Sequence, residues 1–141
     1  MKLNIALLAG DGIGPEVIMK ALNDSRLLLD CTPIIYGSSK VFSFHKKQLD
    51  VKEFNYLNSD SIDGVKDKKI NIINIWKDEI QFELGKPTSD GGRLAFESLE
   101  AATADLASGK IDVLVTAPIS KDAMNKSGFK FPGHTEYLAD M

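Results

Sequence analysis

The sequence predicts an α/β fold: a mostly parallel β-sheet with flanking helices, formed by a single α/β region over residues 1–141. Three short runs rich in Ile, Val and Leu are each bounded by polar or glycine residues, as is typical of buried strands; they are residues 3–9, 70–76 and 111–116. Amphipathic helical patterns lie between these runs. Strands that alternate with helices favour parallel pairing, because each crossover returns the chain to the same end of the sheet.

The helices are expected where apolar residues recur at helical spacing. The first should cover residues 15–29, because Pro15 suits the first helical position. A second, over 39–49, carries Val41, Phe42 and His45 on one side. The remaining expected helices are a long one over 92–108 that stops at Gly109, one over 120–125 and one that starts at 134. Two shorter strands are expected at 33–36 and 54–57.

Composition and charge exclude several functional classes. The chain is 43% hydrophobic and 26% charged with a net charge of -3, which is ordinary for a globular domain and predicts no nucleic-acid partner. The cluster of Lys66, Lys68 and Lys69 is interpreted as a solvated turn. No segment is long and apolar enough to span a bilayer, and the single cysteine, Cys31, fits a reducing cytoplasm. We interpret Cys31 as a buried or incidental thiol and predict a cytoplasmic location.

A glycine-rich turn follows the first strand. Residues 10–16 read Gly-Asp-Gly-Ile-Gly-Pro-Glu, between a strand and a helix. Glycines allow a backbone to approach a ligand closely, and the N–H groups at a helix start can receive an anion. Pro15 stands where a dinucleotide-binding fingerprint needs its third glycine, so that motif is not met. The turn is either a ligand site or a tight structural turn.

Two later turns carry polar groups. Residues 116–121, Thr-Ala-Pro-Ile-Ser-Lys, follow a buried strand, and Lys121 lies in the first turn of an expected helix, where a cation is unfavourable unless it meets an anion. His134 and Thr135 follow a Pro-Gly turn and start another helix. A helix N-terminus lowers the pKa of a histidine, which would leave a neutral imidazole beside the Thr135 hydroxyl. The alternatives are an exposed lysine without a role and a capping or surface histidine; His45 is interpreted as structural or exposed.

Together these segments resemble the 4-hydroxythreonine-4-phosphate dehydrogenase family. The resemblance lies in Val-Thr-Ala-Pro-Ile-Ser-Lys at 115–121 followed by Phe-Pro-Gly-His-Thr-Glu-Tyr-Leu at 131–138. Thr-Pro-Ile-Ile-Tyr-Gly-Ser at 32–38 and Gly-Lys-Pro at 85–87 support it. The resemblance covers essentially the whole chain but under half of a typical member. It therefore implies the N-terminal portion of a truncated, two-domain subunit with an isocitrate/isopropylmalate dehydrogenase-like fold.

The resemblance also implies an activity. Such enzymes use NAD to oxidise and decarboxylate 4-phosphohydroxy-L-threonine to 3-amino-2-oxopropyl phosphate in pyridoxal phosphate (vitamin B6) biosynthesis. It implies a homodimer, a small phosphorylated amino-acid substrate and a divalent metal (Zn, Mg or Co) that polarises the reacting oxygen. His134 and Thr135 match the substrate-binding histidine and threonine of the family. The metal-binding histidines lie beyond this chain, so we expect little or no turnover from it alone, and catalytic and cofactor-binding residues are not assigned.

One departure keeps alternatives open. The family has two more residues in the first turn, whereas the compact Gly-Asp-Gly-Ile-Gly-Pro-Glu form at 10–16 is similar to isopropylmalate and isocitrate dehydrogenases. A related decarboxylating 3-hydroxyacid dehydrogenase is therefore one alternative. A non-catalytic fragment that binds a phosphorylated ligand is another.

Overall fold

A parallel five-stranded sheet forms the centre of the computed structural model, which describes residues 3–8, 14–51, 54–76, 89–117 and 134–140. The side chains of residues 89–91 and 134–136 are outside this description. The strands lie in the spatial order β3-β4-β2-β1-β5, and each adjacent pair is parallel. Their bounds are β1 Leu3–Leu8, β2 Cys31–Gly37, β3 Leu57–Ser59, β4 Asn71–Asn74 and β5 Val113–Thr116. The predicted α/β class and parallel sheet are confirmed.

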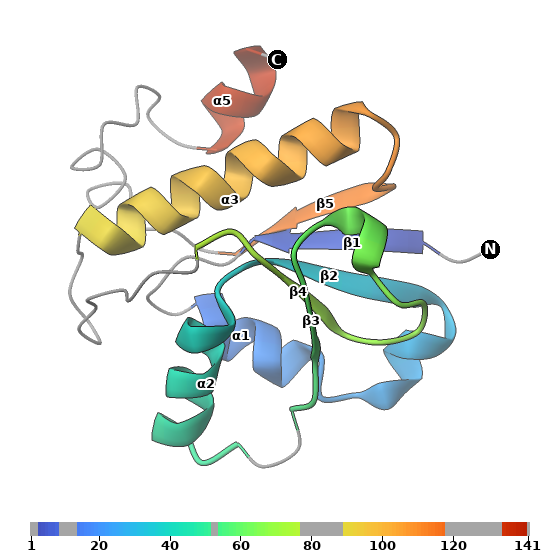
Figure 1. Cartoon of the computed structure of the whole chain (residues 1–141), viewed down its shortest axis with the longest axis vertical. Coiled ribbons are helices and arrows are strands. Elements are labelled where there is room, and N and C mark those ends of the chain that lie inside the picture. The colour runs from blue at the N-terminus through green and yellow to red at the C-terminus, as the bar shows by residue number, and fades with distance from the viewer. Residues whose placement is uncertain (1–2, 9–13, 52–53, 77–88, 118–133, 141) are drawn as a thin grey trace.

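Helices cover both faces of this sheet (Figure 1). They are α1 Gly14–Ala21, α2 Ser39–Gln48, α3 Ser89–Ala107 and α5 His134–Asp140, with two short 3₁₀ segments, η1 Ser25–Leu29 and η2 Ile62–Gly64. The long helix α3 lies on one face, and α1 and α2 lie on the other. None of the helices within the described ranges has the length and apolar character needed to cross a membrane.

The alternation of side chains along the strands produces two apolar layers. On β2, Ile34 and Tyr36 contact the α3 side, whereas Ile35 points to the opposite side, toward α1 and α2. All three side chains are fully buried, because β2 is a central strand covered by helices on both faces. The α3-side cluster comprises Ala6, Leu8, Ile34, Tyr36, Ile73, Ala95, Leu99, Ala102 and Ile111. The α1/α2-side cluster comprises Ile18, Met19, Ile35, Phe42, Phe54, Ile70 and Ile72.

The prediction of one helix over residues 15–29 is wrong in its second half. Helix α1 ends at Ala21, and a separate 3₁₀ segment, η1, begins at Ser25. Asp24 causes the break: its extended backbone caps η1, and its Oδ1 accepts a hydrogen bond from the Arg26 N–H at 3.0 Å. Short polar side chains favour such local bonds over a continuous helix. Leu28 still packs against the core from η1, whereas Leu29 is 68% exposed.

The strand expected at 54–57 is displaced to Leu57–Ser59. The apolar signal came from Phe54, which is buried and stacks on Phe42 with ring centroids 5.9 Å apart, but its backbone precedes the strand. The remaining predicted strands and the helices over 39–49 and 92–108 are confirmed, with ends shifted by a few residues. The helix expected over 120–125 falls outside the described residues.

Two helices end in the same hydrogen-bonded motif. After α3, the Lys110 N–H donates to the Asp105 carbonyl at 3.0 Å and the Gly109 N–H donates to the Leu106 carbonyl at 3.1 Å. Gly109 has φ +79°, as this C-terminal cap requires. After α2 the equivalent position is Asp50, with φ +52°. The predicted stop at Gly109 is therefore confirmed.

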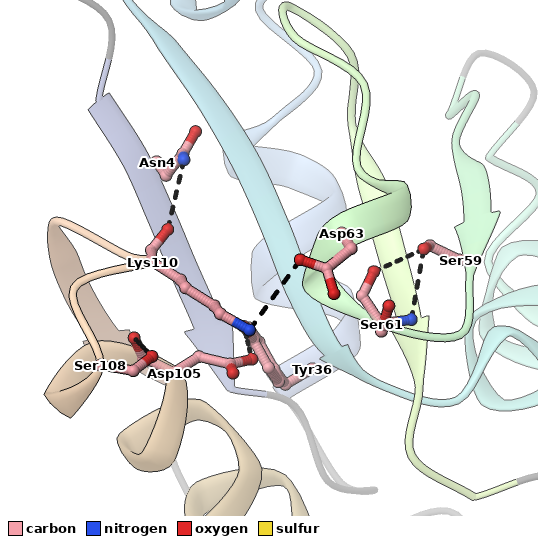
Figure 2. Close-up of polar contacts among 8 residues, drawn as sticks. All are labelled: Asn4, Tyr36, Ser59, Ser61, Asp63, Asp105, Ser108 and Lys110. Atoms are coloured by element: carbon pink, nitrogen blue, oxygen red, sulfur yellow. Dashed lines mark hydrogen bonds and ion pairs between the residues drawn. The ribbon is translucent and has the colours of Figure 1, made fainter.

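Polar contacts tie α3 to the sheet and η2 to the segment between α3 and β5, as Figure 2 shows. The buried Tyr36 hydroxyl donates to Asp105 Oδ2 at 2.7 Å, which joins β2 to α3. Lys110 Nζ lies 3.9 Å from Asp63 Oδ1 of η2. The Asn4 side chain donates to the Lys110 carbonyl at 3.3 Å and so ties β1 to the segment before β5.

Candidate functional site

The strand order creates a topological switch point between β1 and β5. From β1 the chain crosses to β2 on one side, whereas β5 pairs with β1 on the other side. Leu8, the last residue of β1, is in register with Thr116, the last residue of β5. In open α/β sheets, ligands bind outside the carboxyl ends of strands at such a point. In the sequence, the glycine-rich segment at 10–16 follows the end of β1 and the segment at 116–121 begins at the end of β5.

The described part of the first turn is the start of α1. Gly14 and Pro15 are buried there, so they anchor the helix start against the molecule. Glu16, in the first turn of the helix, pairs with Lys20 one turn later at 2.8 Å. Residues 10–13 lie outside the described residues. The strand and the helix on either side of the predicted turn are confirmed, and this is the context in which such a turn can meet a ligand.

The second turn begins at the end of β5. Thr116 is exposed, and Ala117 packs against the α1/α2-side cluster. At Ala117 the chain therefore lies on the α1/α2 side of the sheet. Lys121 lies outside the described residues, so its predicted contact with an anion stays a prediction.

His134 and Thr135 are the first two residues of α5. This confirms the predicted helix start. Tyr137, in the same helix, packs against the α3-side cluster, which anchors α5 next to α3. The side chains of His134 and Thr135 are not among the described ones, so their substrate-binding role also stays a prediction.

The other singled-out residues are structural. Burial raises the pKa of the Cys31 thiol, and the neighbouring Asp30 charge raises it further. The same thiol lies 3.1 Å from the Leu27 carbonyl, so it is a poor nucleophile near neutral pH. His45 is buried, with Nδ1 2.8 Å from the Val41 carbonyl one turn earlier, which confirms its structural interpretation.

The lysine-rich segment before β4 is a solvated turn, as predicted. Lys66, Lys68 and Lys69 are all exposed, and Lys68 has φ +59°. The turn is held by the buried Asn71 side chain, which accepts from the Lys66 N–H and donates to the Lys66 and Lys69 carbonyls at 2.8 to 3.0 Å.

Sequence reasoning missed a recess at the ends of β2, β3 and β4, which includes Ser39, Asn74 and Trp76. The signal was present: Gly-Ser-Ser at 37–39 and Asn-Ile-Trp at 74–76 both lie at the ends of buried strands, where ligand-facing groups are expected.

A metal site is not evident among the described residues, which contain no group of three or more His, Cys, Asp or Glu side chains that could hold a metal ion.

Comparison with known proteins shows which protein family this chain resembles. A family model described as pyridoxal phosphate biosynthetic protein PdxA matches residues 29–141. A 4-hydroxythreonine-4-phosphate dehydrogenase of Bacteroides thetaiotaomicron is 42% identical over 142 residues, covering 99% of this chain and 38% of that protein. One of Sulfurihydrogenibium is 36% identical, covering all of this chain and 42% of that protein.

A solved structure of the enzyme from Burkholderia phymatum superposes with a TM-score of 0.89 at 27% identity, covering 99% of this chain and 43% of the other. A relative from Oceanobacillus iheyensis carries the name D-threonate 4-phosphate dehydrogenase. It is 34% identical, and the match covers 97% of this chain and 42% of that protein. The chain therefore spans about two fifths of the length of the relatives it matches.

Proposed function

Because this chain belongs to the PdxA family of pyridoxal phosphate biosynthetic proteins, we propose that it is the N-terminal portion of an NAD-dependent 4-hydroxythreonine-4-phosphate dehydrogenase. The proposed reaction oxidises the hydroxyl of 4-phosphohydroxy-L-threonine and releases the carboxylate as CO2, which leaves 3-amino-2-oxopropyl phosphate. We propose that the complete subunit has two domains and acts as a homodimer in the cytoplasm. This chain alone should turn over little or no substrate.

The observation that carries the proposal is the switch point between β1 and β5. The register of Leu8 with Thr116 brings together two segments about a hundred residues apart in sequence, and each leads into a turn with ligand-binding features. His134 and Thr135 start α5, where backbone N–H groups and the positive end of a helix dipole favour a phosphate. We propose that the imidazole and the hydroxyl bind the substrate and position its reacting carbon.

The glycine-rich turn is the proposed cofactor side of the crevice. Its place at the end of β1, before the buried start of α1 at Gly14, suits a nucleotide that approaches the backbone. When bound, NAD supplies the hydride acceptor. The expected divalent metal has no ligand group among the described side chains, so we assign it no step here.

Binding and turnover test the proposal separately. Calorimetric titration of the chain with 4-phosphohydroxy-L-threonine should give saturable binding that His134→Ala and Thr135→Ala each weaken about tenfold or more. His45→Gln, at a buried structural position, is the control for a general effect of losing an imidazole. Binding that survives both site substitutions would remove the proposed substrate role. NADH formation at the rate of ordinary dehydrogenases would contradict the expected lack of turnover.

A substrate panel separates the alternatives. D-threonate 4-phosphate belongs in it because a relative at 34% identity carries that name. Isopropylmalate and isocitrate test the related decarboxylating dehydrogenases suggested by the compact first turn. Tight binding of a phosphorylated ligand by the longer polypeptide, without turnover of any panel member, would favour the non-catalytic alternative.

A further inference from the structure

A second ligand-facing feature lies on the same edge of the sheet, beyond β2. It is a recess of about 280 Å³, lined among the described residues by Ser39, Lys40, Asp60, Asn74 and Trp76. These side chains come from the segments that follow β2, β3 and β4, together with the first turn of α2. The recess is separate from the β1–β5 switch point, because β2 lies between β1 and β4.

Asn74 fixes the shape of the recess. Its Oδ1 accepts a hydrogen bond from the Ser39 N–H at 2.8 Å, and its Nδ2 donates to Asn58 Oδ1 at 3.0 Å. The Ile75 N–H donates to the Gly37 carbonyl at 2.9 Å, which keeps the ends of β2 and β4 together. The N-terminus of α2 is thereby held at the recess in a defined position, and it contributes a positive partial charge there.

One buried polar atom of a lining residue lacks a hydrogen-bond partner within the described part of the chain. It is the indole N–H of Trp76, which is 8% exposed. The hydroxyl of Ser38, the residue before the lining residue Ser39, is also buried without a partner. Ser38 precedes α2 but makes no side-chain cap bond. An unsatisfied buried donor is unfavourable, and one that belongs to a residue lining a recess indicates a role beyond packing.

The described lining of the recess contains one cation, Lys40, and one donor without a partner, the Trp76 indole N–H. The Lys40 ammonium and the Trp76 indole can only donate hydrogen bonds. The Arg93 guanidinium stacks on the indole, with Cζ 4.2 Å from the centroid of the Trp76 ring, and it is paired with Glu97 at 3.1 Å, so this pair adds no net charge. Asp60 is the one acidic side chain among the described lining residues. An anion that accepts a hydrogen bond from the Trp76 indole, interacts with Lys40 and lies at the N-terminus of α2 matches this arrangement.

We propose that this recess is a phosphate-binding site, with Lys40 as its principal cation, the α2 N-terminus as its dipole and Asp60 as a residue that weakens affinity by like-charge repulsion. The phosphate could come from a dinucleotide or from a small phosphorylated metabolite, and both present the same chemistry. The proposal does not require the His134 site, so each can fail without the other.

Trp76 provides a specific readout, because it is the single tryptophan of the chain and it lines the recess. Its fluorescence is followed while the chain is titrated with inorganic phosphate against sodium chloride of equal ionic strength. We expect a saturable change in the millimolar range. Lys40→Gln should weaken it about tenfold or more, the equivalent of one charge-assisted hydrogen bond. Lys47→Gln, an exposed lysine of the same helix, should leave it unchanged.

Asp60→Asn should change the affinity for phosphate in the opposite direction. Removing its charge should tighten phosphate binding several-fold, and far-ultraviolet circular dichroism checks that each variant is folded. No saturable fluorescence change, or equal weakening by Lys40→Gln and Lys47→Gln, would overturn the proposal. Parallel titrations with NAD and with 4-phosphohydroxy-L-threonine, repeated in the Lys40→Gln variant, identify the source of the phosphate. The His134→Ala variant should retain the response to inorganic phosphate.

Discussion

The hydrogen bond between Tyr36 and Asp105 should contribute measurably to stability. The Tyr36 side chain is fully buried, and its hydroxyl lies 2.7 Å from Asp105 Oδ2. Hydrogen bonds to charged groups are worth about 1.5–3 kcal/mol. Asp105 is only partly buried, so water can replace part of the lost contact after Tyr36→Phe. We therefore expect that the free energy of unfolding falls by about 1–2 kcal/mol, near the lower end of that range.

Urea unfolding followed by circular dichroism measures this change at neutral pH. The matched control is Tyr56→Phe, because the Tyr56 hydroxyl contacts the Ser43 hydroxyl at 2.9 Å in an exposed setting. The control should change stability by less than about 0.5 kcal/mol. Equal effects of the two substitutions would refute the reasoning, since they would show that burial and charge add nothing to the Tyr36 bond.

The hydrogen bond between Tyr36 and Asp105 also predicts how the free energy of unfolding depends on pH. Burial raises the pKa of Tyr36 well above its ordinary value, and the hydrogen bond to Asp105 and the Asp105 charge raise it further. A folded-state pKa above the unfolded one means that the contribution is complete below about pH 10 and is lost as pH rises above that value. The stability difference between the wild type and Tyr36→Phe should therefore be constant from pH 7 to 9 and shrink above pH 10. A difference that grows with pH would contradict this assignment.

Four further substitutions or reactions test other parts of the fold. Asp50→Gly should stabilise the chain by up to about 1 kcal/mol, because Asp50 has φ +52°; a loss of urea stability would contradict this. Gly109→Ala should destabilise by about 1 kcal/mol for the same reason, since Gly109 has φ +79°. Asn71→Ala should lower the unfolding free energy by about 2–4 kcal/mol, because three backbone groups lose a buried partner. Cys31 should react with a thiol reagent more slowly at pH 8 than it does in urea, because its pKa is raised; equal rates would refute its partial protection.

The first turn shows where local reasoning stops. The sequence over residues 3–29 predicted a strand, a turn and a helix in that order. Strand β1 and helix α1 confirm the strand and the start of the helix. Propensity could not predict the break after Ala21, because Leu22, Leu28 and their neighbours keep a helical period. The Asp24 cap, with its hydrogen bond to the Arg26 N–H, outweighed that period.

Residue order by itself determined the class of the fold, the positions of the four strands β1, β2, β4 and β5 and the place of His134 at a helix start. Those features follow from short-range patterns: apolar runs, turn residues and helix caps. The tertiary structure alone decided that β5 pairs with β1, that Arg93 lies over Trp76 and that Tyr36 meets Asp105, 69 residues away. The physical reason is that a local pattern specifies whether a segment is buried, whereas its neighbour is chosen by the packing of the whole sheet.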